Sequence, residues 1–209
     1  MIFLKITDQV YSGFSVPIFQ TDISGTEGVE GMNDEISRYL LNERSKAKAE
    51  GRFDWATPHD LHKQGNPSID SVVDMFGKAI SHLTRLRFDM EIPSSDISIS
   101  ADVWGSVTSS GAVVSMLNFA PLHWRGIYFV KCDTKVTIEL APPYPPAPIH
   151  GTGKYAKAQT KITLEPKTSG VVVFPANLTH SIVYAPGGGE NIAIEVIAGV
   201  LLTEKEEST

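Results

Sequence analysis

The sequence predicts an α+β protein that is mainly β, a sandwich or jelly roll with supporting helices. Two observations predict this fold. Helical periodicity is confined to residues 32–88, and short β-branched runs separated by Gly, Pro and Asn fill residues 97–200. A chain of 209 residues, 42% of them hydrophobic, can fill one core of this kind. We therefore expect a single domain over residues 1–209.

One strand and two helices are expected before the β-rich part. Ser15–Ile23 mixes apolar and β-branched residues, and Pro17 places this strand at its start or at a sheet edge. Met32–Gly51 repeats apolar residues at helical spacing, and Gly51 ends it. Ser68–Phe88 has the strongest helical pattern, with a serine cap and one apolar stripe formed by Ile69, Val72, Val73, Phe76, Ile80, Leu83 and Leu86.

Eight strands are expected in the second half of the chain. They are Ile97–Val103, Ala112–Leu117, Gly126–Cys132, Lys135–Leu140, Lys161–Leu164, Gly170–Phe174, His180–Tyr184 and Asn191–Val200. Their number and spacing are typical of a sandwich or jelly roll. The stretch Ala141–Gly153 holds five prolines, so we expect a stiff excursion there and not a central strand.

Charge and composition argue against several classes of partner. The net charge is −6, and no block of Lys and Arg is present to bind phosphates, so neither nucleic acid nor an anionic membrane surface is expected. No window is apolar enough for a membrane span, and nothing resembles a signal peptide. The lone Cys132 cannot form an internal disulfide and is expected to be a small buried residue. These features favour a cytoplasmic protein.

The most informative segment is Gly170–Val183, with the sequence GVVVFPANLTHSIV. It resembles the pattern G-x-L-V-L-F-P-x-x-L-x-H-x-V of a group of bacterial iron(II)/2-oxoglutarate-dependent oxygenases, in which the His is the last iron ligand. Shorter likenesses follow the same order along the chain: Trp104-Gly105, Gly126–Val130 (GIYFV) and Asn191–Val196 (NIAIEV). The resemblance implies a double-stranded β-helix, a cupin-like jelly roll with its site in the barrel mouth.

The resemblance also implies that the site is degenerate. A non-haem iron centre uses two His and a carboxylate, and the family supplies two of them from an H-x-H or H-x-D pair. The matching positions here are Leu117 and Phe119, which cannot bind metal, and no H-x-H, H-x-D or H-x-E occurs in the sequence. The family's Arg that anchors the 2-oxoglutarate carboxylate matches Asn191 or a gap beside it, and no Arg follows Arg125 in the sequence. We therefore expect no catalytic residue, metal or cofactor.

Two histidines keep a second interpretation open. His180 is either a surviving metal ligand or a histidine hydrogen-bonded within the barrel mouth. His123 shares the strand parity of positions 117 and 119, so it can replace a lost ligand if it points inward. Pro121 interrupts the strand between them, however, and no carboxylate lies near in the sequence. A substitute metal site at His123 and His180 is the less favoured interpretation.

The predicted mouth is smaller and more apolar than that of an oxygenase, and its ligand-binding residues are Leu117, Phe119, His123, Trp124, Phe174 and His180. The first hypothesis is a non-catalytic oxygenase-like protein. It binds a peptide or small apolar ligand as an accessory in a peptide-modifying or natural-product pathway, with a pathway enzyme as a further partner. The alternative is an active hydroxylase that uses Fe(II) and 2-oxoglutarate at an atypical metal site. A third hypothesis is a module that forms homodimers.

Overall fold

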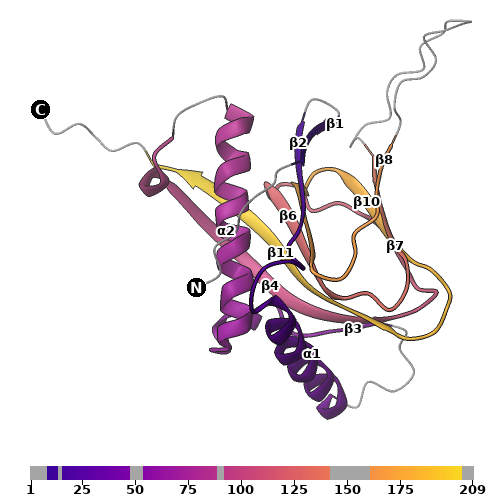
Figure 1. Ribbon diagram of the computed structural model, residues 1–209. Helices are drawn as coiled ribbons and strands as arrows, with labels where there is room; N and C mark the ends of the chain where they lie inside the picture. The colour runs from indigo at the N-terminus through magenta and orange to yellow at the C-terminus, as the bar shows by residue number, and fades with distance from the viewer. Residues whose placement is uncertain (1–8, 14–15, 48–53, 89–91, 142–160, 204–209) are drawn as a thin grey trace, which may run out of the picture.

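The computed structural model describes residues 9–13, 16–47, 54–88, 92–141 and 161–203 (Figure 1). Two α-helices, two short 3-10 helices and eleven strands are found in these residues. In chain order they are β1 (Gln9–Gly13), β2 (Val16–Asp22), α1 (Val29–Lys46), β3 (Asp54–Ala56), η1 (Leu61–Lys63), α2 (Pro67–Phe88), η2 (Ser94–Asp96), β4 (Ile97–Ser109), β5 (Val113–Leu117), β6 (Trp124–Lys131), β7 (Val136–Ala141), β8 (Ile162–Leu164), β9 (Gly170–Pro175), β10 (Thr179–Tyr184) and β11 (Glu190–Leu202).

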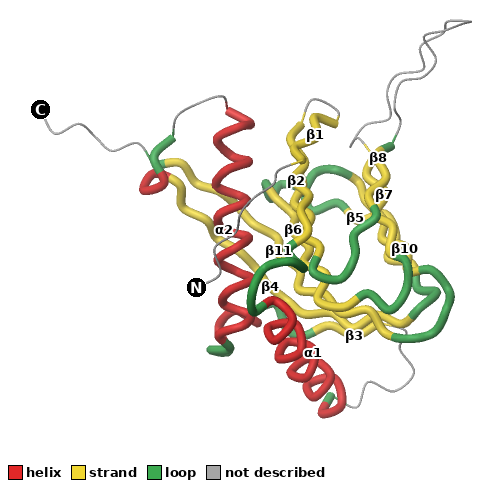
Figure 2. The backbone as a smooth tube through the Cα atoms, viewed as in Figure 1, coloured by secondary structure: helices red, strands yellow, loops and turns green. Residues whose placement is uncertain are grey.

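The strands form two antiparallel sheets that face each other. The larger sheet has the order β1-β2-β9-β6-β11-β4-β3, and the smaller has the order β5-β10-β7-β8. Chain neighbours such as β9 and β10, or β10 and β11, lie in opposite sheets, so the chain passes back and forth between the two layers. This is the double-stranded β-helix that the sequence predicts. Both helices cover the outer face of the larger sheet (Figure 2).

Helix α2 begins one residue earlier than expected and is capped differently. Asn66, not Ser68, is the cap: its Oδ1 accepts hydrogen bonds from the backbone N–H groups of Ser68 and Ile69 at 3.0 and 3.2 Å. Pro67 then occupies the first helical position, which suits its fixed φ. The predicted stripe is buried as far as Leu83 except for the partly buried Val73, and Leu86 is 47% exposed.

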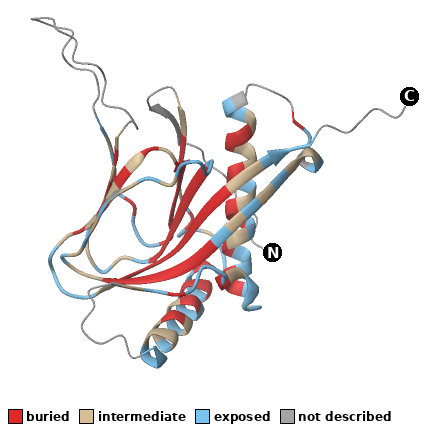
Figure 3. Cartoon of the chain, turned by 180° about the vertical axis from the view of Figure 1, so that it is seen from behind, coloured by how far each residue is buried: buried red, intermediate tan, exposed pale blue. Residues whose placement is uncertain are grey.

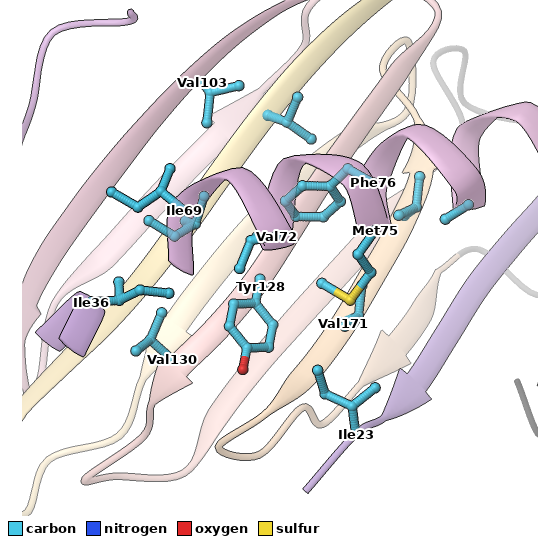
Figure 4. Close-up of a cluster of buried hydrophobic side chains, with 14 of the residues drawn as sticks. Ile23, Ile36, Ile69, Val72, Met75, Phe76, Val103, Tyr128, Val130 and Val171 are labelled. Carbon is cyan, nitrogen blue, oxygen red and sulfur yellow. The ribbon is translucent and has the colours of Figure 1, made fainter. Parts of the chain in front are cut away.

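The interior consists of two apolar clusters, one on each face of the larger sheet. The cluster under the helices contains Ile36, Ile69, Phe76, Tyr128 and Val171, among others (Figure 4). The second cluster fills the barrel between the sheets and includes Ile127, Phe129, Phe174 and residues of the smaller sheet. The inner strands of the larger sheet are buried on both faces (Figure 3).

All eight strands predicted in the second half exist, but several bounds differ. β4 runs to Ser109, six residues further than expected, and continues through Gly105. A glycine is required there because a Cβ would collide with the side chain of Leu40 on α1. The short β1 and β3 were not predicted. The Pro-rich stretch Ala141–Gly153 lies outside the described residues after Ala141, and no described helix is long and apolar enough to cross a membrane.

Candidate functional site

Strand β6 divides its side chains between the two clusters. Trp124, Tyr128 and Val130 belong to the cluster under the helices, whereas Ile127 and Phe129 belong to the barrel cluster. Because successive strand residues point to opposite faces, Arg125 projects into the barrel with Ile127. Only 1% of Arg125 is exposed to solvent, so a charged side chain is buried in an otherwise apolar interior.

Arg125 forms a buried ion pair. Its Nη2 donates to the carboxylate of Glu195 on β11, which is also buried and points into the barrel. Glu195 lies opposite Ile127 in the β6–β11 register, which explains its inward direction. Burial lowers the pKa of Arg125, and the Glu195 carboxylate opposes that shift. The pair therefore places one permanent cation and one carboxylate inside the barrel.

Two aromatic rings contact the Arg125 guanidinium. Its Cζ lies 4.6 Å from the ring centroid of Trp104 on β4 and 4.7 Å from that of Phe119. Both distances are those of a cation–π interaction, which strengthens where water is excluded. Arg125 nevertheless remains incompletely bonded, because its Nε and Nη1 have no hydrogen-bond partner in the described part of the chain.

His180 on β10 faces this group from the smaller sheet. It is 1% exposed and touches two rings, with centroid distances of 5.0 Å to Phe174 and 5.8 Å to Phe119. Burial and the Arg125 charge lower the pKa of His180 to about 4, so the imidazole is neutral at pH 7.

One hydrogen bond determines which nitrogen of His180 carries the proton. Nδ1 lies 3.2 Å from the carbonyl oxygen of Leu178, which can only accept, so Nδ1 is the donor. In the neutral ring Nε2 is then a bare acceptor. It has no hydrogen-bond partner among the described residues.

Four of the six predicted ligand-binding residues lie at this part of the barrel. Leu117 pairs with His180 in the β5–β10 ladder, and Phe119 follows just beyond the end of β5, where its N–H bonds to the carbonyl of Ala176 at 3.0 Å. Phe174 lies opposite Arg125 in the β6–β9 register. Phe119 contacts both Arg125 and His180 and is itself partly exposed. It therefore covers the two polar side chains.

The other two predicted residues, Trp124 and His123, do not lie in the barrel as the sequence analysis expected. Trp124 points away from the barrel: its ring is buried against α2, and its Nε1 donates to Thr84 Oγ1 at 3.1 Å. The sequence interpretation began this strand at Gly126, so it placed Trp124 in the mouth without using the alternation along β6. His123 is exposed, and its Nδ1 accepts a hydrogen bond from the backbone N–H of Val200 at 2.8 Å. It completes the edge of β11 and does not join His180.

Asn191, at the position that matches the family's carboxylate anchor, has other partners. Its side chain is buried, and its Nδ2 donates to Thr134 Oγ1 at 3.1 Å and to the carbonyl of Thr108 at 3.5 Å. Its Oδ1 accepts from the backbone N–H of Thr134 at 3.3 Å. This amide links the β6–β7 turn to the ends of β4 and β11 and has a structural role.

The side chains around His180 do not match the ligand set of a non-haem iron centre. The two positions that the resemblance assigns to ligands carry Leu117 and Phe119, and His123 is elsewhere. Among the described residues, no three His, Cys, Asp or Glu side chains converge to hold a metal ion. The charged group that acts on His180 is instead the Arg125 guanidinium.

Cys132 does not provide a second reactive centre. Burial, with a contribution from Asp133, raises the pKa of its thiol to about 12. The thiol is therefore protonated at pH 7, whereas a nucleophilic cysteine needs a lowered pKa. Cys132 is partly buried at a surface hollow of about 530 Å³ beside Lys135 and Glu165.

Sequence reasoning missed Arg125 and Glu195. A usable signal was present, because each is a single charge inside a run of apolar strand residues, WRGIYFV and NIAIEVIA. One cation and one carboxylate in two buried strands predict a pair, since isolated buried charges are rare. Recognising the pair required knowing that the two strands are neighbours.

Comparison with known proteins shows a likeness in fold. No protein-family model matches the sequence, and no curated protein matches it significantly. Three similar solved structures are HygX from Streptomyces hygroscopicus with nickel and 2-oxoglutarate bound, AviO1 from Streptomyces viridochromogenes Tue57 and a prolyl-4-hydroxylase from Pseudomonas putida. Their TM-scores are 0.53, 0.54 and 0.51, and their identities are 9%, 12% and 10%. They cover 87%, 87% and 90% of this chain, and 82%, 89% and 93% of their own. The chain has the double-stranded β-helix fold of the 2-oxoglutarate-dependent oxygenases.

Proposed function

We propose that this protein is a non-catalytic binding protein on an oxygenase scaffold, which binds a small molecule or a peptide side chain in the barrel without iron. One observation carries the proposal. The Arg125 guanidinium lies against Phe119, the residue at a ligand position, and its charge acts on His180, the residue at the remaining ligand position. A fixed cation thus stands beside the place where the fold family holds its metal.

Electrostatics supports the exclusion of a metal ion from this place. A dication beside the Arg125 guanidinium is repelled, although the paired Glu195 carboxylate offsets part of that repulsion. The neutral His180 cannot offset this repulsion as the single remaining ligand, since structural and catalytic metal sites use three or more. The buried Glu195 carboxylate is already bonded to Arg125.

The surrounding rings support a binding role. Phe119, Phe174 and Trp104 surround a small number of polar atoms, and ligand sites in general combine apolar walls with a few placed polar groups. HygX, which shares this fold, is solved with nickel and 2-oxoglutarate bound, so the fold can hold a small molecule. An accessory role in a peptide-modifying or natural-product pathway remains part of the proposal.

The experiment is a 2-oxoglutarate turnover assay, run with Fe(II) and ascorbate on the wild type and on a His180→Ala variant. We expect succinate formation at background level in both proteins, including in the presence of candidate peptides. Turnover in the wild type that His180→Ala abolishes would establish the active hydroxylase instead.

A concentration-dependent dimer with no ligand-induced rise in melting temperature would favour the dimerisation module.

A further inference from the structure

Some buried polar atoms of the barrel have hydrogen-bond partners and others do not. In the described part of the chain only four buried side-chain nitrogens or oxygens have no hydrogen-bond partner, and three of these are Arg125 Nε, Arg125 Nη1 and His180 Nε2. Leaving such a group unbonded costs roughly 1–3 kcal/mol, and natural proteins contain few of them. All three lie on residues that contact one aromatic ring, Phe119, where water or a bound molecule can complete the hydrogen bonding.

The chemistry of that molecule follows from what each atom lacks. The Arg125 nitrogens are donors, so they require an acceptor. His180 Nε2 is a bare acceptor, because Nδ1 donates to Leu178, so it requires a donor. Water offers both functions, and so does any group that carries a carbonyl and an N–H side by side.

Charge separates the remaining ligand classes. Arg125 and Glu195 already form a neutral pair, so the site carries no net charge to attract an ion. A carboxylate would meet the lone pair of His180 and the negative charge of Glu195, while an ammonium group would meet Arg125. A neutral planar group that accepts from one side and donates from the other matches the hydrogen-bonding needs of both residues.

We infer that the barrel binds a primary carboxamide, whose oxygen accepts from Arg125 and whose nitrogen donates to His180 Nε2, with its organic substituent at the position of the Phe119 ring. The inference rests on the proposed function, since a metal at His180 would occupy Nε2. Phe119 is the entrance, because it is partly exposed and covers both polar side chains. Its ring must turn aside in the wild type for a substituent to enter.

A Phe119→Ala variant tests the inference with benzamide, toluene and benzoate as probes. Removing the phenyl ring leaves a space of the size of benzene beside Arg125 and His180. Benzamide places its ring in that space and its carboxamide on the two residues. Because hydrogen bonds that involve a charged donor are worth on the order of tenfold in affinity, we expect benzamide to bind this variant about tenfold or more tightly than toluene or benzoate.

The control is Phe119→Ala combined with His180→Phe, which keeps an aromatic ring at 180 but removes the acceptor. Benzamide is expected to lose its advantage over toluene there, and the His180 Nε2 signal in ¹⁵N NMR is expected to shift with benzamide in the single variant alone. Equal affinity for toluene, tighter binding of benzoate, or no binding at all would overturn the carboxamide. The iron and turnover measurements are made without these probes, so the proposed function stands or falls separately.

Discussion

The buried Arg125–Glu195 pair makes the most specific energetic prediction. Only 1% of the Arg125 side chain and 11% of the Glu195 side chain are exposed, so removing either partner leaves the other charge uncompensated in the barrel. Breaking a buried pair in this way costs about 3–5 kcal/mol. We expect this loss in the free energy of unfolding for Glu195→Leu. We expect at least as much for Arg125→Met, which also loses the cation–π contacts with Trp104 and Phe119.

A double-mutant cycle separates the interaction from the effects of the single changes. The double variant Arg125→Met/Glu195→Leu removes both charges, and replacing a whole buried pair by apolar side chains is often nearly neutral. Its loss is therefore expected to be smaller than that of either single variant. Urea denaturation measures all four proteins, and with a slope of about 2 kcal/mol per molar each single change lowers the midpoint by about 2 M.

The matched control is the exposed ion pair between Lys78 and Asp74 on α2, with the partners four residues apart. Asp74→Ala is expected to cost at most about 0.5 kcal/mol, because solvent screens the pair. The reasoning is refuted if the two barrel substitutions are additive within about 0.5 kcal/mol, since additive changes would mean that the charges do not interact.

Three other predictions follow from the same structure. The pKa of His180 is about 4 in the folded protein and about 6.5 in the unfolded chain, so the unfolded state binds more protons between these values. Stability attributable to His180 is thus present above pH 6.5, and about 3 kcal/mol of it is lost as the pH falls to 4. Urea titrations at both pH values should show a smaller loss in His180→Phe, and equal losses would contradict this. The double variant Leu117→His/Phe119→Asp is expected to bind Co(II) only weakly, as measured by absorption titration. Adding Arg125→Ser to this double variant is expected to strengthen Co(II) binding. If it does not, the guanidinium does not repel the metal as proposed. Gly126→Ala would place a Cβ 2.7 Å from Phe76 and 2.6 Å from Val196, and we expect it to lower the free energy of unfolding by about 1–3 kcal/mol, as measured by thermal unfolding. In the control Gly77→Ala on α2 the added Cβ meets nothing within 4 Å, and we expect this variant to raise the free energy of unfolding by up to about 1 kcal/mol. A tolerated Gly126→Ala would show that the contact between α2 and the sheet is looser than described.

The sequence predicted the elements well where local pattern determines them. The eight strands of the second half and the apolar stripe of α2 follow from the alternation and periodicity of their own residues. The cap of α2 was misplaced by two residues, since both Asn66 and Ser68 are good caps and only the backbone geometry distinguishes them. β3 is three residues long and depends on pairing with β4, which no local pattern reveals.

The site was harder to predict because it depends on strand parity and on neighbours distant in sequence. A start at Gly126 instead of Trp124 was enough to lose the assignment of Arg125 to the barrel and to place Trp124 there in its stead. Glu195 is 70 residues from Arg125 along the chain, and only the order β6-β11 in the sheet brings the two together. Phe119, Phe174 and His180 lie together in the barrel, as the sequence analysis expected, and their role in binding a ligand stays a prediction.

The central proposal is that a guanidinium stands beside the place where this fold family holds its metal, so that the barrel binds its ligand without iron. The most direct measurement is the iron content per chain after anaerobic reconstitution with Fe(II) and removal of the excess, for the wild type and for His180→Ala. We predict far less than one iron per chain in both proteins, with no difference between them. One iron per chain in the wild type that is lost in His180→Ala would contradict the claim.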